Sequence, residues 1–299
     1  MKTRTFQSAL AAGLLLLTPL AFGQAKQGSS SGRIILDEPG YSVRSRLDWA
    51  AGVLRVEITH TLDPATPSLP RAKGDAETDI QSRLSGFLVT AISGVTVDSS
   101  HTYGELLRGD PALFDRVSDV AAGAQVEGTV LSDDFSQLIA RYALPLFGQN
   151  GIASPLFPTR SVAIPSRLGW VPTRPFSGLL IYAKGKLPAA GSNGAATARP
   201  ALFPRIFDED MTLVLDKGMC SPEALARWGM VGYAASLEDS AALLRVGELP
   251  LRLVARGVFG DNDTDIVIPT EGVRQLLILP ENRALLREGR IVIVYESLD

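Results

Sequence analysis

The chain has 299 residues, of which 45% are hydrophobic and 20% are charged, and its formal net charge is -3 at pH 7. This length and composition predict one or two packed domains and exclude a globally disordered chain. A mildly acidic chain has no general attraction for nucleic acid or for an anionic membrane surface. We therefore expect no nucleic-acid partner, and membrane contact that is at most peripheral.

The first residues have the features of a secretory signal peptide. Two positive charges, Lys2 and Arg4, precede the apolar run SALAAGLLLLTPLAF, and small residues follow at the spacing that a signal peptidase reads. The apolar run is shorter than the roughly 20 residues that a membrane span needs. We predict cleavage of residues 1–25 and a mature chain that is periplasmic or secreted. A retained N-terminal anchor is the alternative.

Residues 33–148 are predicted to form an α+β domain with an antiparallel sheet. A strand, a turn over residues 50–52 and a second strand come first. In the second strand polar residues alternate with apolar ones, which predicts one buried face. The apolar residues of that face are Leu54, Val56 and Ile58.

A long amphipathic helix is predicted next, because apolar residues recur every three or four positions over residues 76–92. Gly94 is the expected stop. Asp110 followed by Pro111 has the form of a helix cap with proline in the first turn. Two strands joined by a turn at residues 133–134 complete the domain.

Prolines and glycines are concentrated over residues 149–175, where we predict a linker or irregular crossover and place the domain boundary. Residues 176–299 are predicted to form a second α+β domain of short strands, with short helices in SPEALARWG, TEGVRQLLI or PENRALLREG. Residues 188–198 lack apolar periodicity and are predicted to be a loop. The expected fold class is therefore α+β: two compact units with mainly antiparallel sheets and a few packed helices.

Three consecutive acids, Asp208, Glu209 and Asp210, follow the run RPALFPRIF and precede another strand-like run. This pattern favours a hairpin turn. Adjacent acids point in different directions, whereas carboxylates that share acid/base work must face one another. The alternative is a hydrolase that uses these acids or Cys220, the only cysteine. We expect that thiol to be buried and inert, since no histidine stands beside it in the sequence.

The sequence predicts no metal or cofactor site. His60 and His101 are the two histidines, and their spacing suggests no shared ligand set. The segment GDNDTD, residues 260–265, starts like a calcium loop but lacks the required glycine and final glutamate. Its alternate aspartates are Asp261, Asp263 and Asp265. A polar turn is favoured there, with a weak cation site as the alternative. Phosphate-binding and dinucleotide fingerprints are missing, so we predict no catalytic, cofactor-binding or metal residues.

The three tryptophans, Trp49, Trp170 and Trp228, are predicted to be core anchors or rim residues rather than ligand-stacking groups. Trp170 and Trp228 each adjoin a glycine, where the backbone can turn tightly around a large ring. A pocket at the linker lined by both of them would instead indicate a binding module.

Several segments resemble, in the same order, the LPP-twenty lipoprotein family. They include LDWAAGVLRVEIT, ISGVTVDSSHTYGELL, DPALFDRVSDVAAGAQVEGTVL and RYALPLFG. That family includes the flagellar envelope protein FlgP and resembles the N-terminal domain of FlgT. Later segments such as FSGLLIYAKG look like the C-terminal extension of longer secreted members. This chain lacks the cysteine that carries lipid in many members. The resemblance implies a non-enzymatic envelope protein and supplies no active-site residues.

We therefore predict an exported, non-enzymatic envelope protein that acts as a structural or assembly factor, with a flagellar basal-body link implied by the resemblance. Its expected partners are envelope or flagellar proteins and further copies of itself, which its strand edges could present to one another. One alternative is a periplasmic module that binds a small ligand or peptide at the domain interface. The other is the exported hydrolase described above.

Overall fold

The computed structural model describes residues 32–297. The predicted signal peptide, residues 1–25, lies outside the described residues. The described chain contains seven α-helices and fifteen strands. Most strand pairings are antiparallel, so the predicted α+β fold with two units and mainly antiparallel sheets is confirmed.

A five-stranded antiparallel sheet organises the first region, in the order β1-β2-β3-β5-β4. Its strands are β1 Arg33–Glu38, β2 Tyr41–Asp48, β3 Val53–Thr61, β4 Gln125–Leu131 and β5 Gln137–Pro145. The predicted turns at residues 50–52 and 133–134 join β2 to β3 and β4 to β5. The predicted buried face of β3 is also confirmed, because Leu54, Val56 and Ile58 are all buried.

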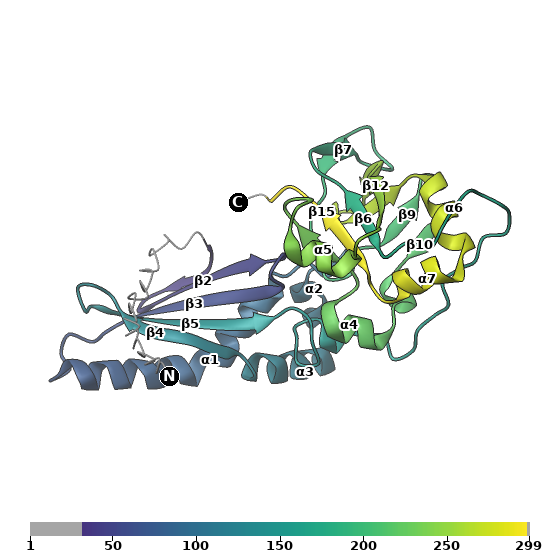
Figure 1. Cartoon of the computed structure of the whole chain (residues 1–299). Helices are drawn as coiled ribbons and strands as arrows, with labels where there is room; N and C mark the ends of the chain where they lie inside the picture. The colour runs from purple at the N-terminus through teal and green to yellow at the C-terminus, as the bar shows by residue number, and fades with distance from the viewer. Residues whose placement is uncertain (1–31, 298–299) are drawn as a thin grey trace, which may run out of the picture. The chain divides into compact units, whose positions relative to one another are not determined.

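Helix α1, Leu69–Ser93, runs along one face of this sheet, and α2, Tyr103–Gly109, and α3, Pro111–Ala122, pack against α1 (Figure 1). Helix α1 ends at Gly94, as predicted, and its apolar face is buried against β3 and its neighbours. The predicted cap of α3 is confirmed, since the Asp110 carboxylate accepts a hydrogen bond from Leu113 N at 3.1 Å.

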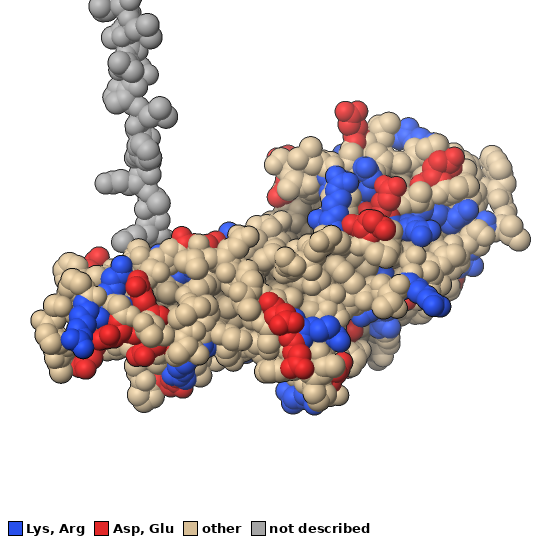
Figure 2. Space-filling view, turned by 90° about the horizontal axis from the view of Figure 1, so that it is seen from below, with Lys and Arg blue, Asp and Glu red and all other residues tan. Residues whose placement is uncertain are grey.

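The other face of the sheet carries charged side chains, as is typical of an antiparallel sheet with one solvated side. Arg55 pairs with Glu127 at 3.2 Å, and Arg141 pairs with Glu57 at 2.9 Å. Figure 2, a view from below and therefore not of this outer sheet face, shows acidic and basic residues interspersed there as well. The sign of the surface charge thus alternates over short distances on that face.

The second region contains a four-stranded sheet, β11-β15-β6-β12, in which every pairing is parallel. Its strands are β6 Leu179–Tyr182, β11 Gly232–Ala234, β12 Leu251–Val254 and β15 Ile291–Val294. The central strands β6 and β15 are almost entirely buried. Unbroken apolar runs such as IVIV suit a parallel sheet that is covered on both faces.

A second four-stranded sheet has the order β10-β9-β14-β13, and β7 and β8 form a separate hairpin. These strands are β7 Lys186–Pro188, β8 Ala195–Thr197, β9 Ile206–Asp208, β10 Leu213–Leu215, β13 Gly257–Phe259 and β14 Asp265–Ile268. The prediction of a loop over residues 188–198 is wrong at both its ends. Backbone pairing of Ala195–Thr197 with Lys186–Pro188 needs no apolar periodicity, so composition did not reveal it.

Four helices belong to this region: α4 Pro222–Trp228, α5 Ser240–Val246, α6 Thr270–Ile278 and α7 Pro280–Arg287. All the predicted helices form, and α6 and α7 lie side by side (Figure 1). Helix α5 was not predicted. Its start is nevertheless marked in the sequence, because the Asp239 carboxylate accepts a hydrogen bond from Ala242 N at 2.9 Å.

The segment over residues 149–175 is an irregular crossover that contains one short 3-10 turn, Ser154–Leu156. It is tied to the first region by a hydrogen bond from Ile152 N to Pro145 O at 2.9 Å. It is tied to the second by a hydrogen bond from Arg167 N to Leu277 O at 3.4 Å. The crossover therefore contacts both regions, while residues 165–170 within it are exposed. The domain boundary placed in it stays a prediction.

Residues 96–101, here called the junction loop, carry the main contacts between the two regions. Leu202 N donates to Thr96 O at 3.1 Å, and Phe203 N donates to Val97 O at 2.8 Å. On the other side of the loop, Asn262 N donates to Ser99 O at 3.0 Å. The loop is thus held from both sides, and the two regions pack against each other.

A buried carboxylate fixes this arrangement. Asp265 is fully buried and accepts hydrogen bonds from Arg205 N at 2.8 Å and from Arg205 Nε at 2.9 Å. Arg205 Nη2 lies 2.7 Å from the same carboxylate and donates to Ser99 Oγ at 2.8 Å. One guanidinium therefore connects the junction loop to strand β14. A buried charge without such donors would be strongly destabilising.

Replacing Asp265 should weaken the whole fold. Asp265→Asn removes the charge that Arg205 meets, so we expect the free energy of unfolding to fall by about 2–3 kcal/mol. The measurement is urea denaturation followed by tryptophan fluorescence. Asp261→Asn is the matched control, because Asp261 is an exposed acid in the same turn. Equal stability of the two variants would contradict this role for Asp265.

Gly260 should tolerate no side chain. Its φ is +90°, and a Cβ there would lie 2.3 Å from Ser99 Cβ. Gly185 supplies the control, because its φ is +78° and a Cβ added to it would meet nothing within 4 Å. Both alanine variants carry a similar backbone strain, so Gly260→Ala should lose about 1–3 kcal/mol more than Gly185→Ala in denaturant unfolding. Equal losses of unfolding free energy in the two variants would contradict this, because they would show that Ser99 and the junction loop move aside at little cost.

Candidate functional site

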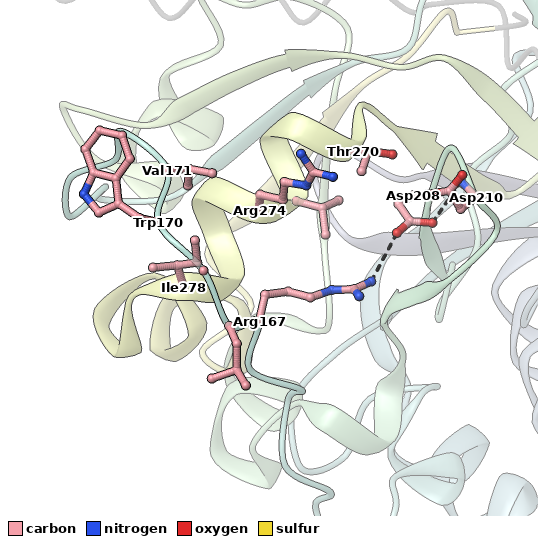
Figure 3. Close-up of a pocket in the computed structure, with 11 residues that line it drawn as sticks. Arg167, Trp170, Val171, Asp208, Asp210, Thr270, Arg274 and Ile278 are labelled. Atoms are coloured by element: carbon pink, nitrogen blue, oxygen red, sulfur yellow. Dashed lines mark hydrogen bonds and ion pairs between the residues drawn. The ribbon is translucent and has the colours of Figure 1, made fainter.

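A polar cavity with an exposed aromatic side chain beside it lies between the crossover, the β9–β10 turn and helix α6. Its volume is about 350 Å³. We call it the arginine pocket, and it is lined by Arg167, Leu168, Gly169, Trp170, Val171, Asp208, Asp210, Thr270, Val273, Arg274 and Ile278. Figure 3 shows these side chains, which come from segments far apart in the sequence.

Asp208 builds the floor of this pocket. It ends β9, is buried, and accepts hydrogen bonds from Asp210 N at 3.1 Å and Thr212 N at 2.7 Å. The predicted hairpin turn after Phe207 is therefore confirmed, and β10 pairs antiparallel with β9. The second oxygen of Asp208 lies 3.4 Å from Arg167 Nη2 (Figure 3). Asp208 thus closes the turn and orients Arg167.

Glu209 points elsewhere. Its Oε2 accepts a hydrogen bond from Thr270 N at 2.9 Å, and its Oε1 lies 3.5 Å from Arg256 Nε. The hydrogen bond from Thr270 N caps the start of helix α6, where the helix dipole also stabilises a negative charge. Glu209 therefore points away from its two neighbours, whereas Asp208 and Asp210 both line the arginine pocket. Of the two, Asp210 makes no ion pair with any described residue.

Two guanidinium groups extend into the pocket, Arg167 from the crossover and Arg274 from α6 (Figure 3). Arg274 Nη1 is 3.9 Å from Glu271, a long contact between exposed groups that contributes little. Both arginines keep N–H donors available, since each guanidinium has five. The lining therefore combines two cations, the carboxylates of Asp208 and Asp210, and the Thr270 hydroxyl.

The crossover adds exposed apolar surface at the rim. Leu168 is 99% exposed and Trp170 is 85% exposed. Figure 3 shows the Trp170 ring at the end of the pocket away from Asp208 and Asp210. Charged groups that fix orientation, beside an aromatic ring that supplies contact area, are the usual components of a binding site.

The three tryptophans lie in different surroundings. Trp170 is at the rim of the arginine pocket, whereas Trp49 and Trp228 are half-buried and line a separate cavity. Trp49 contacts the Tyr233 ring at 5.5 Å. Trp170 and Trp228 therefore line different cavities.

The remaining candidates from the sequence have structural surroundings. Cys220 is buried, and its Sγ lies 3.8 Å from Asp216 O. Burial raises the pKa of this thiol to about 12, so it is not a nucleophile at neutral pH. The segment at residues 260–265 is a turn that leads into β14, and its last acid is the buried partner of Arg205.

The two histidines are not brought together. His60 lies against the Tyr41 ring and is 3.7 Å from Asp79, while His101 is 3.1 Å from Asp98 in the junction loop. Within residues 32–297, His, Cys, Asp and Glu side chains form no group of three or more that could hold a metal ion.

Sequence reasoning did not find Arg167 or Arg274. Neither residue stands in a sequence motif. They come together only because the folded crossover passes beside α6. The three acids gave the only signal for this site, and they marked the turn correctly without revealing that Asp210 faces a cavity.

Two family models match the chain. Residues 40–150 match the N-terminal domain of Treponema pallidum Tp0624, and residues 178–297 match the second domain of the same protein. The chain is thus similar to two domains of that protein in the same order, with the crossover between them. A search among curated proteins gave no match. Among the described residues, no helix has both the length and the apolarity needed to cross a membrane.

Cys220 should react only when the protein unfolds. With its pKa near 12, the thiolate fraction at pH 8 is at least ~1000-fold below that of an ordinary thiol, so iodoacetamide labelling should be slower by that factor than in denaturant. Burial keeps the Cys220 thiol protonated in the folded protein. Its contribution to the free energy of unfolding is therefore complete below pH 9 and is lost as the pH rises from about 9 to about 12. Mass spectrometry measures the labelling, and rapid modification of the folded protein would contradict the buried geometry.

Proposed function

We propose that this protein is an exported, non-enzymatic module of the cell envelope that serves assembly by binding a carboxylate-bearing peptide in the arginine pocket. The observation that carries the proposal is the pairing of Arg167 and Arg274 in one cavity beside an exposed tryptophan. Guanidinium groups bind carboxylates through charge-assisted hydrogen bonds with a defined geometry.

The ligand chemistry follows from the lining. The lining carries two cations and two carboxylates, but Asp208 is already held by three donors, so the free N–H groups of Arg167 and Arg274 favour a bound segment with negative charge near the arginines. Asp210 accommodates one N–H donor of the ligand. Trp170 and Leu168 favour an apolar or aromatic ligand side chain next to the carboxylate, because large apolar groups exposed at a rim gain by being covered.

A hydrolytic function has less support. Asp208 already accepts three donors, and Glu209 caps a helix, so neither faces a second carboxylate across a substrate. The thiol of Cys220 is buried and protonated at neutral pH. Binding requires only the groups that the pocket presents.

Assembly is the role we favour for such binding, because a pocket that takes an acidic peptide segment would let this protein hold a partner protein. Export is inferred from residues 1–25, and partners in the envelope follow from it. Further copies of this chain are a second kind of partner. The flagellar link rests on the resemblance to the LPP-twenty family alone.

The arginine pocket should distinguish charged from neutral peptides. We expect acetyl-Ala-Phe-Glu with a free C-terminus to bind, and its Gln amide analogue to bind at least about tenfold more weakly, since a charge-assisted hydrogen bond contributes about 1.5–3 kcal/mol. Arg274→Gln should weaken binding of the acid peptide by a similar factor. The measurement is isothermal titration calorimetry.

Arg252→Gln is the matched control, because Arg252 is an exposed arginine on β12 outside the pocket. That variant should bind the acid peptide as the unchanged protein does. Absence of binding at millimolar peptide, or equal affinities for the acid and amide peptides, would refute the proposed function.

A further inference from the structure

A second cavity, of about 330 Å³, lies where the β2–β3 turn meets helices α4 and α5. We call it the tryptophan hollow. It shares no lining residue with the arginine pocket, and it is lined by Trp49, Ala50, Ala51, Gly52, Phe147, Arg227, Trp228, Gly232, Tyr233, Ala241, Ala242, Arg245 and Val292.

Small residues create the space in this hollow, and aromatic residues form its walls. Alanines and glycines come from the β2–β3 turn, from β11 and from α5. At Gly232 even a Cβ would lie 3.0 Å from Arg245 Cδ. The walls are the rings of Trp49, Phe147, Trp228 and Tyr233. Such a lining favours a flat ligand that can stack on aromatic faces.

Arg245 makes the hollow electropositive. It is 8% exposed, and its guanidinium donates to Gly289 O, Trp228 O and Gly229 O, each at 2.8 Å. These carbonyls lie at or just beyond the C-terminal ends of α4 and α7, where a cation is favourable. A guanidinium has five N–H donors, so two remain after these three bonds.

No carboxylate balances this charge within the hollow, because none of its described lining residues is acidic. Burial lowers the pKa of Arg245 to about 9, which leaves the group cationic at neutral pH. Arg227 lies over the Trp228 ring at 4.5 Å, and Arg245 is 5.0 Å from the same ring. Two cations of the lining therefore lie against the Trp228 ring.

We propose that the tryptophan hollow binds a small aromatic carboxylate. The ring of the ligand packs among the aromatic walls, and its carboxylate meets the guanidinium groups of Arg227 and Arg245. A buried cation that is matched only by backbone carbonyls gains most from a ligand that brings the missing negative charge. This site is independent of the peptide-binding function proposed above.

The test compares benzoate with benzamide, its neutral isostere, and with inorganic phosphate, by calorimetry on the whole mature chain. Benzoate should bind at least about tenfold more tightly than either of the others. Arg227→Gln should weaken benzoate binding by a similar factor, and Ala241→Leu should abolish it by filling the space. Arg245 is left intact because its three carbonyl contacts hold two helix ends.

Arg274→Gln, in the arginine pocket, is the matched control and should bind benzoate normally. The circular-dichroism spectrum and melting temperature of each variant show whether it is folded. The proposal is overturned by equal affinity for benzamide or phosphate, by no benzoate binding at millimolar concentration, or by loss of binding in Arg274→Gln rather than in Arg227→Gln.

Discussion

The buried Asp265 carboxylate and the arginine that meets it hold the two regions of this protein in register. Arg205 reaches Asp265 in strand β14 and Ser99 in the junction loop. Strand β9 begins at the next residue and ends at Asp208, which closes the turn and orients Arg167. The position of the arginine pocket thus depends on the pair of Arg205 and Asp265. The buried Asp265 carboxylate needs the hydrogen bonds of Arg205, because a buried charge without donors is strongly destabilising.

The chain uses its charges in three distinct ways. On the outer face of the five-stranded sheet, exposed ion pairs contribute little to stability. In the interior, Asp208, Asp265 and Arg245 are surrounded by donors or acceptors and hold turns and helix ends. At the two cavities the arginines are held only weakly by acids. Arg167 and Arg274 make long ion pairs at 3.4 and 3.9 Å, and the lining of the tryptophan hollow contains no acidic residue. This last group supports a binding role, because cations beside aromatic rings are suited to anionic ligands.

Local patterns predicted the elements whose determinants lie close together in the sequence. Apolar periodicity located α1, Asp110 marked the start of α3, and the acids after Phe207 marked a turn. Contacts between distant segments were not predictable in this way. The parallel pairing of β6 with β15 depends on register between strands far apart in the chain, and so does the approach of Arg167 to Asp208 across the crossover. The separation of Trp170 from Trp228 has the same origin. A neighbouring glycine allows a local turn of the backbone, but it does not determine which distant segment the tryptophan ring contacts.

The three tryptophans allow one measurement to test the central claim, which is that two separate cation-lined sites bind anionic ligands. Their indole N–H signals can be assigned in a two-dimensional ¹H–¹⁵N NMR spectrum from single Trp→Phe variants. Titration with the acid peptide should shift the signal of Trp170 alone, and titration with benzoate should shift those of Trp49 and Trp228 and leave Trp170 unmoved. Unchanged spectra with both ligands, or the same shifts with the peptide amide and benzamide, would contradict the account.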